Sequence, residues 1–282
     1  LRNRNQGLGI SNQITSRLNE KRQMTWIDAL RISKQTTHWD FNVYLFGEIN
    51  KRPDDKQMRQ HTLVGDSWLQ TTDIAQTYKN VNPYGKLSAS YLLNDSNSIG
   101  ACVYYDRYAY NGGEGTSNVT ILKNGSLDEK NFSEYHSIAQ SKNFGSNFYY
   151  YGKVGKLGVD FNTDYMWYGK KEPMNTHEVY TGTDAIKHTE DINTHRRTYN
   201  WIIASKLVLS YPVWNGTFSW GIEGSKTNRK EYYSVLPENK VSNVSNHIDE
   251  IMQAMMVDYA RQLGPLSVQV GLRYEHLNFK FY

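Results

Sequence analysis

Apolar side chains recur at every second residue over long stretches of this chain. Leu157, Val159 and Phe161 fall on one side of an extended backbone and Asp160 falls on the other, and residues 266–275 alternate in the same way. A period of two residues is the pattern of a β-strand with one apolar face. No stretch of ten or more residues keeps a convincing helical period, so the pattern predicts an all-β, antiparallel fold.

Eleven stretches carry this pattern and are separated by polar turn sequences. The predicted strands cover residues 7–18, 22–33, 37–50, 82–93, 98–110, 134–151, 157–170, 194–211, 217–235, 248–263 and 266–282. The connections alternate in length from residue 34 onward. The short ones are 94–97, 152–156, 212–216 and 263–265, and the long ones are 51–81, 111–133, 171–193 and 236–247. Residues 17–22 would form one unusually short connection on the side of the long ones.

Sorting of connections by length is typical of an outer-membrane β-barrel, which has short periplasmic turns and long extracellular loops. The charge pattern agrees, because the apolar positions of the six clearest strands contain no Asp, Glu, Lys or Arg. An Arg or Lys facing the middle of the lipid costs about 2–4 kcal/mol. A soluble antiparallel sandwich also alternates apolar and polar residues, but it has no reason to sort its connections.

Composition restricts the other classes of function. The mean hydropathy of −0.70 does not argue against a barrel, since only every second residue of a membrane strand must be apolar. The net charge of +4 is small and spread along the chain, so no nucleic-acid partner is expected. The single cysteine, Cys102, excludes an internal disulfide framework and a zinc site with several cysteines.

Four segments resemble the Bacteroidota outer membrane beta-barrel family, whose members are similar to the barrel region of TonB-dependent receptors. The segments are Trp39-Asp-Phe-Asn-Val-Tyr-Leu-Phe-Gly47, Ser90-Tyr-Leu-Leu-Asn-Asp-Ser-Asn-Ser-Ile-Gly100, Gly158-Val-Asp-Phe-Asn162 and Val270-Gly-Leu-Arg-Tyr-Glu275. The resemblance implies a location in the outer membrane of a Gram-negative bacterium, with membrane lipid as a partner. It also implies uptake of a bulky nutrient, an unidentified extracellular ligand, and energy coupling to an inner-membrane complex.

Barrels of this kind close about 22 strands around a plug. Residues 1–282 supply about half of that number, and they contain no recognisable plug, coupling box or closing strands. We therefore expect one domain, an incomplete barrel region spanning residues 1–282.

Ligand contacts are expected from aromatic residues of the long connections and from polar residues of the barrel interior. The candidates are Trp68, Tyr108, Tyr110, Tyr180, Tyr232, Asp160, Asp164 and Arg273. Aromatic rings beside amide groups suit glycans and peptides, although they suit packing within loops equally well.

Two clusters offer other chemistry. His177, His188, Glu190, Asp191 and His195 are potential metal ligands, but their spacing fits no specific motif and a solvated loop explains them better. Asp160 and Asp164 share a strand face as a catalytic pair would, yet a polar barrel interior is the simpler interpretation. We therefore expect no enzyme activity, cofactor or metal. The alternatives to import are a non-transporting barrel for adhesion, assembly or scaffolding, and then a soluble β-rich binding domain.

Overall fold

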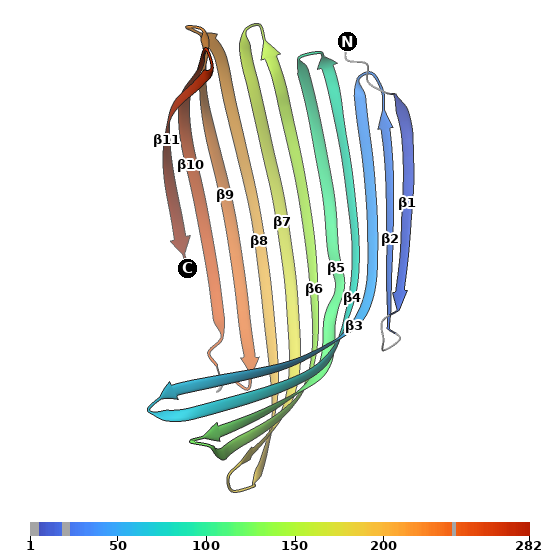
Figure 1. Ribbon diagram of the computed structural model, residues 1–282, viewed down its shortest axis with the longest axis vertical. Helices are drawn as coiled ribbons and strands as arrows, with labels where there is room; N and C mark the ends of the chain where they lie inside the picture. Colours follow the sequence, from blue (N-terminus) through green and yellow to red (C-terminus); the bar gives the residue numbers. More distant parts are fainter. Residues whose placement is uncertain (1–5, 19–22, 239–240) are drawn as a thin grey trace.

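The computed structural model describes residues 6–18, 23–238 and 241–282, in which all regular structure is β-strand. Eleven strands form one antiparallel sheet, and each pairs with its neighbours in the sequence (Figure 1). The strands are β1 (Gly7–Leu18), β2 (Met24–Gln35), β3 (Trp39–Val64), β4 (Asp66–Asn94), β5 (Asn97–Lys123), β6 (Ser126–Val154), β7 (Leu157–Gly182), β8 (Lys187–Val213), β9 (Gly216–Leu236), β10 (Val244–Leu263) and β11 (Leu266–Phe281). The predicted number and order of strands are confirmed.

The sheet is a single curved layer with almost no hydrophobic interior. Among the described residues, only Val235 and Ala254 are buried hydrophobic side chains. Leu45, Val103 and Ile222 keep 48%, 40% and 47% of their surface exposed. A soluble sandwich would bury such side chains between two sheets. The soluble alternative is therefore wrong, because this apolar face needs apolar surroundings outside the protein.

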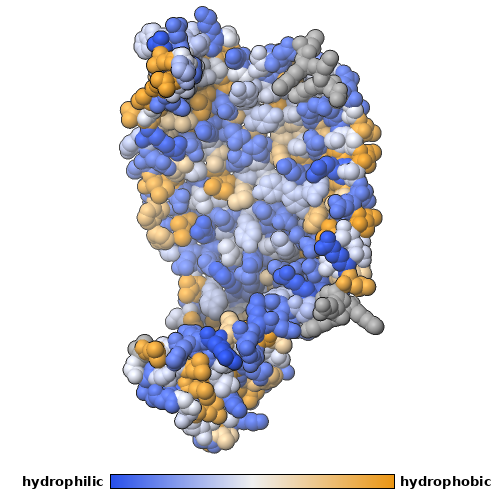
Figure 2. Space-filling model, in the orientation of Figure 1, coloured by the Kyte–Doolittle hydropathy of each residue, from blue (hydrophilic) through white to orange (hydrophobic). Residues whose placement is uncertain are grey.

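The register keeps the two faces of the sheet distinct. Phe161 is paired with Tyr150 and Leu207, which puts their apolar side chains on one face. Asn162 is paired with Tyr149 and Lys206, and their polar groups lie on the other. We call these the convex face and the concave face. Figure 2 looks into the hollow of the sheet and shows mainly hydrophilic residues there, with hydrophobic residues along the sides.

Three of the expected long loops are strands, so that part of the prediction is wrong. Residues 51–81, 111–133 and 171–193 lie in the hairpins β3–β4, β5–β6 and β7–β8, apart from their tight turns. Lipid imposes the alternation of apolar residues, and polar strands beyond the membrane have no such requirement. The alternation of apolar residues therefore ends at the edge of the membrane, although the hydrogen-bonded pairing of the strands continues beyond it. The turn Asn124-Gly125 has φ values of 50° and 83°, as a two-residue hairpin turn requires.

The remaining two connections are less informative. Strand β9 ends at Leu236 and β10 begins at Val244, so the expected loop 236–247 is shorter than predicted. Its residues 239–240, and residues 19–22 of the expected connection 17–22, lie outside the described residues.

The hairpins of long strands share one end of the sheet, and the tight turns share the other, as the sorting of connections predicted. At the long end, β3–β4 and β5–β6 lean across the concave side (Figure 1). Bulges interrupt the pairing of β5 with its two neighbours, between Val81 and Tyr84 on β4 and between Tyr108 and Asn111 on β5 itself. A bulge bends a strand and increases its twist, so these bulges help the hairpins to lean inward.

The orientation of the sheet in the membrane can be tested by labelling. After replacement of Cys102 with serine, a cysteine at Lys187 should react with a membrane-impermeant maleimide on intact cells. A cysteine at Lys156, in a tight turn, should react only after the outer membrane is opened. Both positions are exposed in the protein, so access across the membrane is the only expected difference. Labelling of residue 156 on intact cells would show that the tight turns, and not the long hairpins, face the outside of the cell.

Candidate ligand-contact face

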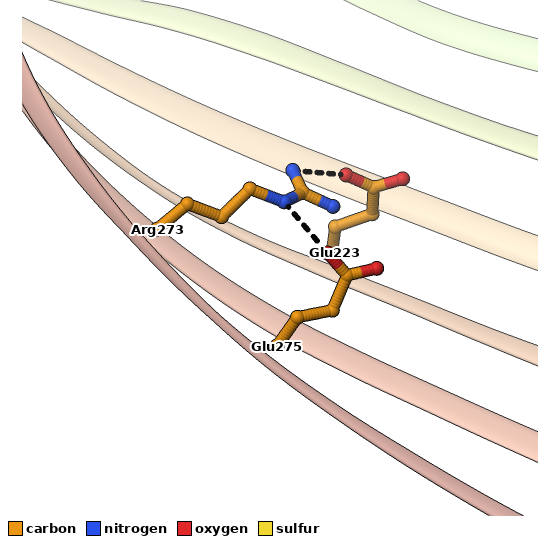
Figure 3. A network of polar contacts seen from close by, with 3 residues as sticks. All are labelled: Glu223, Arg273 and Glu275. Atoms are coloured by element: carbon orange, nitrogen blue, oxygen red, sulfur yellow. Dashed lines mark hydrogen bonds and ion pairs between the residues drawn. The ribbon is translucent and has the colours of Figure 1, made fainter.

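An arginine of β11 reaches across β10 to a glutamate of β9 on the concave face, near the C-terminal edge. Arg273 of β11 donates from Nη1 to Oε2 of Glu223 on β9 at 3.0 Å, and from Nε to Oε2 of Glu275 at 3.2 Å (Figure 3). Strand β10 lies between, and its Ala254 is paired with both glutamates and only 4% exposed. The small alanine lets the guanidinium pass over β10, so both carboxylates have a fixed cationic partner.

Amide groups bind Asp164, one of the two predicted acidic residues of this face. Asn147 of β6 donates from Nδ2 to Asp164 at 2.8 Å and to the side-chain oxygen of Asn162 at 2.7 Å. Asn162 in turn donates to Asp164 at 2.9 Å. Asp160 lies two residues before Asn162 on β7 and is exposed. Asp164 is thus part of an amide network, and its hydrogen bonds do not include Asp160.

A row of tyrosine rings, flanked by an arginine of β2, crosses the concave face of β3–β5, and the sequence pattern did not predict it. The Arg31 guanidinium lies 5.5 Å from the Tyr44 ring, and the Tyr44 and Tyr84 ring centroids are 5.9 Å apart. Tyr84 and Tyr104 stack with centroids 6.3 Å apart. These residues are far apart in the sequence, and only the register between strands brings them into line. A periodicity taken strand by strand cannot find such a row.

The hairpins contain their own polar network beyond the apolar band. The Gln76 side chain, 8% exposed, donates to Asp54 at 2.6 Å and accepts a hydrogen bond from the Tyr135 hydroxyl. The ion pair with Lys56, at 2.7 Å, holds the pKa of Asp54 below its usual value. Burial raises the pKa of Tyr135. Gly115 makes room for this network, because an added Cβ would lie 2.8 Å from the Tyr135 hydroxyl.

The tips of β3–β4 and β5–β6 are tied together by Asp66. This carboxylate accepts hydrogen bonds from Asn124 Nδ2 and forms an ion pair with Lys123, both at 2.9 Å. The Ser67 amide donates to Asn124 Oδ1 at 2.9 Å. The hydrogen bond from Asn124 and the bond to Lys123 lower the pKa of Asp66.

Because its folded-state pKa is depressed, Asp66 should stabilise the tie above its ordinary pKa of about 3.8 and lose that effect as the pH falls further. We expect the amides of Ser67 and Asn124 to exchange slowly at pH 6. At pH 3 they should exchange faster, after correction for the intrinsic rate. In Asp66→Asn, which cannot form the ion pair, the pH dependence should largely disappear. Equal protection of the wild type at both pH values would contradict the tie.

The predicted ligand residues do not converge on one site. Asp160, Asp164 and Arg273 lie on the concave face. Tyr180 and Trp68 lie on the same face. Tyr180 donates a hydrogen bond to Glu178, and the Trp68 ring lies 4.9 Å from the Lys123 Nζ. Tyr108 sits at the β5 bulge. Tyr110, with Lys79 Nζ at 5.6 Å from its ring, and Tyr232, 43% exposed, lie on the convex face instead. Their role in ligand contact stays a prediction.

The histidine-rich segment is divided between the faces of the sheet. His188 is paired with Tyr180 on the concave face, whereas Asp191 is paired with His177 on the convex face, where the two side chains are 2.7 Å apart. The alternation of a β-strand therefore separates neighbours in sequence. Within the described part of the chain, no group of three or more His, Cys, Asp or Glu side chains is arranged to hold a metal ion.

The C-terminal part of the sheet gives the decisive comparison. Residues 152–282 match the outer membrane protein beta-barrel family. Together with the uncovered apolar face and the eleven-stranded antiparallel sheet, this match makes the fold a transmembrane β-barrel sheet and its location the outer membrane. In the described residues no helix has the length and apolarity needed to cross a membrane.

Solved structures of outer-membrane proteins are similar to the chain at low identity. The siderophore receptor PiuA from Acinetobacter baumannii is 8% identical with a TM-score of 0.36, covering 91% of this chain and 49% of that one. The ferric preacinetobactin receptor BauA from the same species is 7% identical with a TM-score of 0.31, covering 97% and 57%. The toluene transporter TodX of P. putida is 8% identical with a TM-score of 0.27, covering 97% and 87%. The chain spans about half the length of the two receptors. No curated protein matches it.

Proposed function

We propose that this chain is the barrel portion of a receptor similar to TonB-dependent receptors and that it serves the uptake of a bulky, polar nutrient. The observation that carries the proposal is the length of the hairpins. Strands β3 to β8 have 26–29 residues each, whereas about 9–11 residues cross a membrane. Each strand is therefore more than twice as long as the crossing requires, and two of the three hairpins lean over the polar concave face (Figure 1).

Such an arrangement suits capture of a solute before passage. The leaning hairpins present amide, hydroxyl and aromatic groups, and the concave face below them continues with the Tyr44 row and the Arg273 network. Under this proposal the concave residues bind and guide a solute and perform no chemistry on it, so no cofactor is required. Energy coupling to an inner-membrane complex and an origin in Bacteroidota belong to the same proposal and rest on the resemblance of the sequence motifs.

The test uses the full-length protein in its own host. Growth is measured with ferric chelates, oligosaccharides or oligopeptides as limiting sources, for the wild type, a gene deletion, and a variant in which residues 57–73 of the β3–β4 hairpin are replaced by a two-residue turn. The deletion should abolish growth on one class of source, and the shortened variant should reproduce that defect while still reaching the membrane. Normal growth of the deletion strain on every source, with loss of surface attachment, would favour a non-transporting barrel.

A further inference from the structure

Seven basic residues form a row across the convex face of β3–β9. Each of these strands can be followed from its tight-turn end along the positions that face outward. The first charged residue on that path is always Lys or Arg. These residues are Lys51, Lys79, Arg107, Lys142, Lys171, Arg197 and Lys226. The chain has nearly equal numbers of basic and acidic residues, 32 and 28, so composition does not explain one sign on seven consecutive strands. We call this set the basic row.

The residues of the basic row are exposed and form no ion pairs among the described residues, although Asp249 of β10 lies on the same face as Lys226. All seven are exposed, and within the described residues none of them forms an ion pair. Arg107 is paired directly with Lys142, and Lys171 directly with Arg197. Like charges placed opposite each other destabilise a sheet. An anionic partner outside the chain would relieve this repulsion.

In the described part of the chain, two basic residues of the concave face have ion-pair partners, whereas the residues that follow them in the sequence, which belong to the basic row, have none. Lys170 forms an ion pair with Glu172 at 2.5 Å, and Arg196 forms one with Glu231 at 2.5 Å. Lys171 and Arg197 are the next residues in the sequence and face outward without a partner. At these two positions the concave basic residue is paired with a carboxylate, and its outward-facing neighbour is not paired with any described one.

The row borders the apolar band where lipid headgroups would lie. Trp201 faces outward four residues from Arg197, and Lys226 Nζ lies 5.7 Å from the Trp201 ring. Directly below Lys226, next to Gly224, a groove of about 500 Å³ opens on the convex face. Its apolar lining residues are Phe161, Leu207, Ile222, Met255 and Tyr274. A cationic rim above an apolar groove matches a molecule with an anionic head and a hydrocarbon tail.

We propose that the basic row binds the phosphate groups of glycolipids in the outer leaflet, with an acyl chain in the groove beside Gly224. The proposal rests on the outer-membrane location and on the outward orientation of the long hairpins, and it does not depend on what the barrel transports. Charge-assisted hydrogen bonds from Arg and Lys to phosphate are strong. The row continues the lipid-facing band, which argues for a lipid rather than a soluble protein as the partner.

The test compares two triple variants of the full-length protein. Lys142→Gln, Lys171→Gln and Arg197→Gln remove charge from the basic row. Arg52→Gln, Lys86→Gln and Arg229→Gln remove equal charge from the concave face. Binding of bisphosphorylated lipid A to each purified protein in neutral detergent is measured by native mass spectrometry. A basic residue near an anionic lipid surface contributes about a fivefold factor, so the row variant should bind more than tenfold more weakly. The concave variant should stay within about twofold of the wild type.

Charge-conserving replacements separate binding from folding. Lys142→Arg, Lys171→Arg and Arg197→Lys together should retain wild-type binding, even if the glutamine variant folds poorly. Dephosphorylated lipid A should bind the wild type more than tenfold more weakly than lipid A. Equal affinity of the two glutamine variants, or of the two lipids, would overturn the proposal. If millimolar inorganic phosphate displaced lipid A, the row would be a site for free phosphate and not for a lipid.

Discussion

Replacing Val103 with arginine should destabilise the inserted sheet by about 2–4 kcal/mol, as expected for a basic residue at mid-depth in lipid. Val103 lies on the convex face, paired with Leu87 and Ser146, between the start of β5 at Asn97 and Arg107 of the basic row. The guanidinium would have to remain in hydrocarbon or distort the strand to reach the headgroups. The measurement is the free energy of unfolding in urea for the protein refolded into lipid vesicles, with the shift of the folded band on unheated gels as a second readout.

The matched control is Asn162→Arg, on the opposite face of the same sheet. Asn162 faces the concave side, where Asp164 accepts its hydrogen bond and Asp160 is the next residue on that face. An arginine there meets water and carboxylates, so we expect a change below about 1 kcal/mol, comparable to a surface substitution. Similar losses at residues 103 and 162 would mean that the two faces have been assigned incorrectly.

The second large effect concerns the edges of the sheet. Within the described residues, β1 pairs only with β2 and β11 pairs only with β10. All sixteen residues of β11 are exposed. Each unpaired backbone group in hydrocarbon costs several kcal/mol, and in water an open edge recruits other strands. Residues 1–282 refolded without any other polypeptide should therefore form oligomers or aggregates rather than a closed monomeric pore.

Light scattering coupled to size-exclusion chromatography in detergent measures the state of the refolded chain, and planar bilayers measure its conductance. We expect species larger than a monomer and no stable single-channel steps. A monomeric fraction that conducts ions steadily would contradict this result, because it would require β1 and β11 to pair with each other.

Much of the fold was predictable because lipid leaves a local signature in the sequence. The alternation at Leu157, Val159 and Phe161 reports a strand with one apolar face, and the tight turns follow from short polar segments. The extensions of β3–β8 were missed because that signature ends with the membrane. Residues such as Gln70, Thr72 and Gln76 pair in a ladder without any apolar face to reveal it.

The candidate site was less predictable because its contacts run across strands. Arg273 and Glu223 are 50 positions apart and meet only through the register of β9, β10 and β11. The histidine-rich run gave the opposite error, since residues adjacent in sequence lie on opposite faces. The basic row lay within reach of sequence reasoning, because continuing the outward-facing positions beyond each apolar run leads to it.

The strict neighbour order of the sheet has a consequence for how such proteins change over time. Each described strand contacts only the strand before it and the strand after it, so no central packing unit depends on all of them at once. A whole hairpin can be removed or duplicated while every other contact in the ladder is kept. Because barrel diameter grows with strand number, the circumference of this architecture can evolve in steps of two strands. Each step changes the width of the passage without requiring the remaining wall to be redesigned.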